Sequence, residues 1–207
     1  MSTLLTYLFT FVTIRLTGGI KMMNQTQTKM KTQDLVQTAL MAALIAVGAF
    51  ITVPLGPVPF TMQNFFVFMA GLLLVPKLAG LSVLTYVLVG LIGLPVFAGF
   101  TGGPQMVLAP TFGFLIAFIL GAMLISKLAY GEKSFIKILA VLILAEVVFY
   151  AIGLPYMYMV LTRVNGTPMT FQATLTAGMI PFLGPDLLKA VLAAFIAPKI
   201  LTALNRH

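Results

Sequence analysis

The chain has 207 residues, of which 60% are hydrophobic and 8% are charged, against roughly a quarter charged in an ordinary soluble domain. Four carboxylates and twelve cations cannot give a protein of this length a polar shell, so the composition excludes a soluble globular protein and predicts an integral membrane protein. The net charge of +8 lacks a basic cluster with interleaved aromatic residues, which argues against a nucleic-acid partner.

The apolar runs are continuous and lack the alternation of barrel strands, so they predict α-helices. Because a span needs about 20 apolar residues, the chain after its first thirty residues has room for about six. The predicted fold class is therefore an all-α membrane protein, a bundle of six transmembrane helices. The sequence has no cysteine and its single histidine is His207, which excludes disulfides, thiolate or histidine metal sites and histidine-dependent triads.

Residues 1–30 are predicted to be an N-terminal extension that precedes one transmembrane domain, residues 31–207. The apolar run at residues 3–14 is short for a span. Its basic residues, Arg15 and Lys21, follow the run, whereas a signal peptide carries them first. The favoured interpretation is a poorly ordered or non-native extension, and the alternative is an interfacial anchor.

Six apolar segments of spanning character follow in chain order. They are predicted at residues 35–53, 60–75, 78–94, 107–126, 138–160 and 180–204. Pro54, Pro57 and Pro59 break any helix after the first span and predict an extended loop. A glycine-rich stretch at residues 93–103 follows the third span, and a polar loop at residues 163–172 precedes the last.

The basic residues predict the orientation of the bundle. If the N-terminus is cytoplasmic, alternation of the spans leaves only Arg163 outside. The basic residues that then lie inside are Lys29, Lys31, Lys77, Lys127, Lys133, Lys137, Lys199 and Arg206. This bias fits the positive-inside rule, so both termini are predicted to be cytoplasmic.

Two ionisable residues in the last predicted span indicate a functional site. Asp186 and Lys189 share one helical face in the motif GPDLLKA, because they are three residues apart. Charged groups at membrane depth are unfavourable and usually mark function, although the pair could be a salt bridge that only eases insertion. Pro185 suggests that a helix begins here, with free N–H groups suited to a polar ligand.

Other polar residues leave their roles open. Glu146 lies in the middle of the fifth span, where a packing or supporting role is favoured over a proton relay, with Tyr150 further outward. Gln63 and Asn64 begin the second span and suit either a neutral polar ligand or helix capping.

Small residues line one face of the first span. Ala39, Ala42, Ala43 and Ala46 form this face, and small faces let helices approach closely. The face suits either an internal contact or the docking of another membrane subunit.

Four motifs, taken together and in order, resemble the BioY family of biotin-specific substrate-binding (S) components of energy-coupling factor (ECF) vitamin transporters. These motifs are PVPFTMQN at residues 57–64, GLIGLPVFAGFTGG at residues 90–103, LAPTFGFLIAF at residues 108–118 and GPDLLKA at residues 184–190. The resemblance covers nearly everything after about Met30.

The resemblance implies a six-helix bundle of the ECF S-component type that binds biotin near its outer face, in a prokaryotic cell membrane. Ala39 and Ala43 would face the ECF transmembrane subunit, and two separate ATPase subunits would use ATP. The chain itself lacks the pattern GxxxxGK[ST], so it is not expected to hydrolyse ATP. As a transporter subunit it is expected to be no enzyme and to need no cofactor of its own. The implied substrate-binding residues are Asp186, Lys189, Gln63, Asn64, Thr101, Gly102, Gly103, Phe114 and Tyr150.

Two positions depart from the pattern of the family and leave open how the biotin carboxylate is held. Thr101 stands where some members have Asn, and Leu115 stands where some have Arg. Arg163 in an outer loop is an alternative anchor.

Two other functions remain as alternatives to a biotin S component. One is a self-sufficient secondary transporter of a small vitamin with Glu146 as its proton carrier, and the other is an S component for a different vitamin. A membrane enzyme is disfavoured, because the sequence offers no paired catalytic carboxylates and no usable His or Cys.

Overall fold

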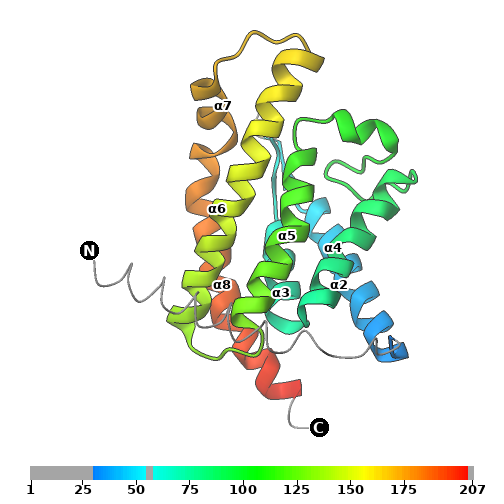
Figure 1. The fold of residues 1–207 in the computed structure, drawn as a ribbon, viewed down its shortest axis with the longest axis vertical. Helices are drawn as coiled ribbons and strands as arrows, with labels where there is room; N and C mark the ends of the chain where they lie inside the picture. The colour runs from blue at the N-terminus through cyan, green and yellow to red at the C-terminus, as the bar shows by residue number, and fades with distance from the viewer. Residues whose placement is uncertain (1–29, 55–57, 205–207) are drawn as a thin grey trace.

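The computed structural model describes residues 30–54 and 58–204, and within them the protein is a bundle of α-helices (Figure 1). The predicted extension at residues 1–30 falls almost entirely outside the described residues and stays a prediction. The helices are α2 (Thr32–Phe50), α3 (Gln63–Leu73), α4 (Pro76–Leu91), α5 (Phe112–Ala129), α6 (Phe135–Met159), α7 (Phe171–Gly178) and α8 (Ile180–Leu204).

Four helical segments of this part of the chain are long and apolar enough to cross a membrane. They are α2, α5, α6 with its π-helical continuation η2 (Val160–Val164), and α7 joined to α8. The shorter apolar helices α3 and α4 complete the bundle. The prediction of a six-helix bundle is thus confirmed.

The structure corrects the boundaries of the first two predicted spans. Helix α2 ends at Phe50, and strand β1 (Thr52–Val53) pairs antiparallel with strand β2 (Phe60–Thr61) before α3 begins. β-branched residues favour extended backbone, and prolines remove the N–H donors that a helix needs. The two paired strands, called the hairpin below, therefore lie where the sequence analysis placed the ends of two helices. Residues 55–57 of the predicted extended loop lie outside the described residues.

Two further helix boundaries differ from the predictions. The fourth span begins at Phe112, and a 3₁₀ helix η1 (Pro104–Leu108) precedes it, since Pro110 disfavours helical backbone just before α5. The predicted polar loop at residues 163–172 leads into a short helix, α7, that the sequence analysis did not predict. Thr170 caps this helix by accepting a 3.1 Å hydrogen bond from the Ala173 N–H.

The prediction that a helix begins at Pro185 is wrong. Helix α8 begins at Ile180, and Pro185 lies inside it. Membrane helices tolerate internal proline because neighbouring groups satisfy the freed carbonyls, so the residue did not mark a boundary. The free N–H groups expected at this position are therefore absent from the described helix.

Helices α5 and α6 approach each other closely through glycines. A Cβ atom at Gly121 would overlap the Phe149 ring, and one at Gly153 would overlap the Phe114 ring. Larger residues would push the two helices apart at both levels. The pair forms a fixed wall that carries some of the side chains of the site described below, among them Phe114 of α5 and Tyr150 of α6.

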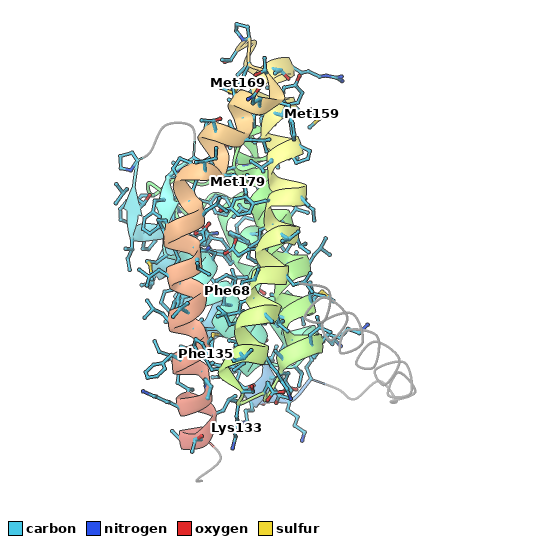
Figure 2. The ribbon with its side chains drawn as sticks, turned by 90° about the vertical axis from the view of Figure 1, so that its left-hand side faces the viewer. Phe68, Lys133, Phe135, Met159, Met169 and Met179 are labelled. Carbon is cyan, nitrogen blue, oxygen red and sulfur yellow. The ribbon has the colours of Figure 1, made fainter. Side chains whose placement is uncertain are left out.

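The buried and exposed faces of the helices are both apolar, as expected in lipid. In α8 the fully buried residues after Lys189 are alanines, whereas Leu188 and Phe195 are exposed on the opposite side of the helix. Figure 2 shows Lys133 at one end of the long axis and Met159 and Met169 at the other. The end of α8 lies at the same end of the bundle as the start of α2 (Figure 1).

Candidate ligand-binding cavity

A cavity of about 320 Å³ lies between α3, α5, α6 and α8, beside the hairpin and the glycine-rich loop. This volume falls at the lower end of the range of small-molecule sites. Its wall combines apolar and aromatic side chains with a few polar groups. The lining residues are Val58, Pro59, Thr61, Gln63, Asn64, Tyr86, Phe97, Ala98, Thr101, Met106, Ala109, Pro110, Thr111, Phe112, Phe114, Leu115, Phe118, Glu146, Phe149, Tyr150, Gly178, Phe182, Asp186 and Lys189.

The cavity contains the salt bridge that the sequence pattern indicated. Lys189 Nζ lies 2.7 Å from Asp186 Oδ1, and the two residues are only 4% and 8% exposed. With Phe182 they lie on one face of α8, since the spacings of three, four and seven residues share a helical face. Each charge of the pair neutralises the other, which makes their burial tolerable.

Asn64, at the start of α3, joins this pair to a second carboxylate. Its amide nitrogen donates to Asp186 Oδ1 at 3.0 Å and to Glu146 Oε1 at 3.1 Å. Its amide oxygen accepts a 2.8 Å hydrogen bond from Lys189 Nζ. The side chain of Asn64 therefore belongs to the cluster, and the alternative of helix capping does not apply to it.

Two further groups complete the cluster. The Tyr150 hydroxyl of α6 donates to Asp186 Oδ2 at 2.5 Å. Lys189 Nζ also donates to the backbone carbonyl of Thr61 in β2, at 2.8 Å, and lies 4.3 Å from the centre of the Phe60 ring. The hairpin, α3, α6 and α8 thus meet at one polar network, in which cation and carboxylates are hydrogen-bonded as buried charges require.

The rest of the wall is aromatic. Phe118 and Phe149 meet edge to face with ring centres 4.7 Å apart, and Phe114 meets Tyr150 edge to face at 6.3 Å. Across the cavity, Phe97 packs so closely on Gly90 that an added Cβ there would overlap its ring. Such a wall suits the apolar part of a ligand, with the polar cluster fixing its orientation.

Two buried polar groups in the wall have no hydrogen-bond partner among the described residues. They are the amide nitrogen of Gln63, a residue 5% exposed, and the hydroxyl of Tyr86, a residue 2% exposed. A buried donor without a partner is destabilising by about 1–3 kcal/mol. Both residues line the cavity, so a bound ligand or a water molecule can supply the missing partner.

The structure brings most of the predicted site residues to this one cavity. Those that line it are Asp186, Lys189, Gln63, Asn64, Thr101, Phe114 and Tyr150. Gly102 and Gly103 support the loop next to them without lining the cavity, and the Gly103 N–H donates to the Gly90 carbonyl at 2.7 Å. Gly103 has a φ of 104°, which glycine adopts at little cost.

The remaining predictions concern which residue would hold the carboxylate of a ligand. Leu115 lines the cavity, whereas Arg163 is exposed in η2 and is not among the lining residues. The sequence analysis missed Tyr86 and Phe97 as lining residues and favoured a supporting role for Glu146, which the structure places in the wall itself. Glu146 carried a signal as a carboxylate at membrane depth, while Tyr86 resembles any tyrosine of an apolar helix.

The alanine face of α2 divides into an inner and an outer part. Ala42 is buried in the bundle, whereas Ala39 and Ala43 are exposed, with Leu40 and Val47 exposed nearby. No helix of the described bundle therefore buries Ala39 or Ala43. Their side of α2 is an apolar surface with small residues at its centre, available to lipid or to another membrane helix.

A bundle of apolar helices around a cavity with a buried polar cluster defines a membrane-embedded binding protein. The model of the BioY family matches residues 4–206. The chain is 42% identical over 168 residues to the protein named biotin transporter BioY of Thermotoga maritima, covering 81% of this chain and 95% of that one. It is 43% identical over 171 residues to the probable biotin transporter BioY of Pyrococcus horikoshii, covering 83% and 98%.

A solved structure agrees with these relatives. The crystal structure of the S-component for biotin from an ECF-type ABC transporter matches with a TM-score of 0.62 and 29% identity, covering 83% of this chain and 94% of that chain. The chain therefore belongs to the BioY family, and its bundle has the fold of an ECF S component. It is a multi-pass membrane protein of the transporter class.

Proposed function

We propose that this chain is the substrate-binding membrane subunit of a biotin uptake transporter of the ECF type. The observation that carries the proposal is the buried cluster of Asp186, Lys189, Asn64 and Glu146 at the wall of an aromatic cavity of about 320 Å³. The names of the two transporter relatives and of the matching S-component give biotin as the substrate to test first.

The chemistry of biotin suits this cavity. Its ureido ring offers two N–H donors and one carbonyl acceptor, and the cluster offers carboxylate oxygens together with the Gln63 amide. Its thiophane ring and aliphatic chain match an aromatic wall that includes Phe118 and Phe149. Gln63, Thr101 and Phe114 retain their proposed roles as substrate-binding residues, with Gly102 and Gly103 shaping the loop.

The proposed subunit has no chemistry of its own and works with partners. Ala39 and Ala43 dock on the ECF transmembrane subunit, and two ATPase subunits hydrolyse the ATP, so the chain needs no cofactor. The exposure of both alanines on the apolar side of α2 supports this assignment. Substitution of either by Leu should leave biotin binding intact and reduce uptake in cells that contain the whole transporter.

The proposed orientation places both termini in the cytoplasm of a prokaryotic cell. The positive-inside bias of the loops supports it. The cavity lies beside the hairpin and the glycine-rich loop, which are then on the outer side, so biotin is captured from outside. Reporter fusions after Leu204 and within residues 165–169 test this orientation, and an inverted result overturns it.

Thermal unfolding of the purified protein in detergent tests the substrate. A ligand that binds only the folded state raises the unfolding temperature by mass action. We expect biotin to do so among a panel that also contains thiamine, riboflavin and pantothenate, and radiolabelled biotin should bind in proportion to protein. A response to another vitamin without a response to biotin would reassign the substrate.

A further inference from the structure

The hydrogen bonds of the cluster show which of its groups are already used. Lys189 has three ammonium hydrogens, and Nζ makes three hydrogen bonds, to Thr61 O at 2.8 Å, to Asn64 Oδ1 at 2.8 Å and to Asp186 Oδ1 at 2.7 Å. Asn64 has two amide hydrogens, and they go to Glu146 and Asp186. Both donors are therefore fully engaged within the protein.

The two carboxylates of the cluster differ in the same respect. Asp186 uses both oxygens, because Oδ1 accepts from Lys189 and Asn64 while Oδ2 accepts from Tyr150. Glu146 accepts one hydrogen bond at Oε1, and no described residue donates to its Oε2. Since an ionised carboxylate has about four acceptor positions, Glu146 retains more unused acceptor capacity than Asp186.

The position of Glu146 directs this capacity toward the cavity. Glu146, Phe149 and Tyr150 all line it, because residues three and four apart share one face of α6. The hydrogen bond from Asn64 holds Oε1, which fixes the carboxylate against α3. Gly121, under Phe149, keeps this part of α6 close to α5. The acceptor is thus presented by a rigid element next to the apolar wall.

We propose that Glu146 is a specificity residue that contacts the substrate, its carboxylate accepting an N–H of the ureido group. This inference rests on the proposed function and adds a contact to it. Asn64 is then a positioning residue for Glu146, and the Asp186–Lys189 pair holds Asn64. The cavity selects ligands with an N–H donor at this point, such as cyclic ureas, over lactones or carbamates that present an oxygen there.

A different role for Glu146 is that of a counter-charge to Lys189 without ligand contact. The two roles predict different behaviour for Glu146→Asp and Glu146→Gln. Asp keeps the negative charge but withdraws the oxygens by one methylene, whereas Gln keeps the length and the bond from Asn64 but can turn an N–H toward the ligand. If Glu146 contacts the ligand, both variants should bind biotin weakly. If it is only a counter-charge, the biotin affinity of Glu146→Asp should stay close to that of wild type.

The test measures equilibrium binding to purified full-length protein in detergent, with biotin and with two analogues in which one or the other ring N–H is replaced by oxygen. Desthiobiotin, which retains the ureido group, is the control ligand. Glu132→Gln is the matched control variant, because it makes the same substitution in a loop outside the cavity lining. Thermal unfolding without ligand confirms that each variant is folded.

Loss of a hydrogen bond to a charged group corresponds to roughly ten- to a hundredfold in affinity. We expect this loss for biotin and desthiobiotin in both Glu146 variants, and less than about twofold in Glu132→Gln. We also expect wild type to disfavour one of the oxygen analogues by a similar factor, and Glu146→Gln to lose most of that discrimination. Such a change in ligand preference is not produced by a merely structural role.

Three results overturn the proposal. Wild-type affinity in Glu146→Asp makes the residue a counter-charge, and undiminished discrimination in Glu146→Gln places the N–H acceptor elsewhere. If Glu146→Gln does not fold, Glu146→Asp and the analogue series on wild type decide, since equal binding of biotin and both analogues excludes an N–H contact. Failure of the proposed function gives a different result from these three, because wild type itself then does not bind biotin and both proposals are wrong.

Discussion

The two halves of α8, residues 180–189 and 190–204, bury their inner faces by different means. In the first half, Asp186 and Lys189 line the cavity and are held by hydrogen bonds that Asp186 accepts from α3 and α6 and that Lys189 donates to α3 and the hairpin. In the second half the inner face is entirely apolar and has no exposed area at all. Its residues are Ala190, Ala193, Ala194 and Ala197.

The difference shows that one helix can provide close packing along one half and a polar binding surface along the other. The alanine half requires only close packing, because its small side chains let neighbouring helices approach and fill the space. The polar half needs partners, because each of its charges is stable only while the others are present. A change in the first half should therefore act on binding and stability together, and a change in the second half on stability alone.

The largest expected effect is the removal of one member of the buried pair. Asp186→Ala or Lys189→Ala leaves an uncompensated buried charge, which should lower the free energy of unfolding by about 3–5 kcal/mol. Either change should also weaken biotin binding by at least about a hundredfold. Thermal unfolding and radiolabelled biotin binding measure the two effects. The double variant should be less destabilised than the sum of the single ones. Unchanged biotin affinity in both single variants would remove the pair from the site.

A smaller loss is expected from Tyr150→Phe, which removes one hydrogen bond to Asp186 and little volume. A hydrogen bond to a charged group contributes about 1.5–3 kcal/mol, part of which should appear as weaker binding of biotin. Titration calorimetry measures it, with Tyr130→Phe, a substitution at an exposed residue beyond α5, as the control. Equal affinities in the two variants would mean that the hydroxyl does not support the site.

Overpacking of the alanine half should separate stability from binding. Ala194→Leu inserts a large side chain where no space is exposed, which is expected to lower stability by about 1–3 kcal/mol. Biotin affinity of the folded protein should change by only a few fold. Phe195→Leu on the exposed face is the control for unfolding temperature. A folded Ala194→Leu protein that has lost binding would show that the two halves are not independent.

The smallest effect is expected at a solvated ion pair outside both halves. Partial burial raises the pKa of the Glu132 carboxyl, but hydrogen bonds from the Ser134 and Lys133 N–H groups and the nearby Lys137 ammonium outweigh it, so that pKa is lowered from 4.5. A lowered pKa in the folded state adds stability that is fully present above about pH 4.5 and is lost as the pH falls through the folded value.

The contribution of Glu132 is small because solvent screens the pair. Unfolding temperatures of wild type and Glu132→Gln should therefore differ slightly at neutral pH and converge on acidification below about pH 4.5. A difference that grows on acidification would contradict this sign.

The bundle was predictable from sequence because its six predicted spans are largely apolar runs, and the pair Asp186–Lys189 was visible as charges at membrane depth. The hairpin and α7 were not predictable in the same way, because they depend on local backbone chemistry rather than hydropathy. The place of Glu146 depends on a contact with Asn64, which lies far away in sequence. Tyr86 had no signal, since only the packing of α4 makes it part of the wall.

The shortness of α3 has a consequence for how the protein enters the membrane. Its 11 residues extend only about 16 Å, roughly half the hydrocarbon thickness, and β1 and β2 precede it. During synthesis such a segment is a weak insertion signal by itself, so α3 and α4 should enter the bilayer as one helical hairpin. Chains truncated between the two helices are then expected to leave α3 outside the bilayer. Only after α4 is synthesised would α3 insert and bring Asn64 to the membrane depth of the binding site.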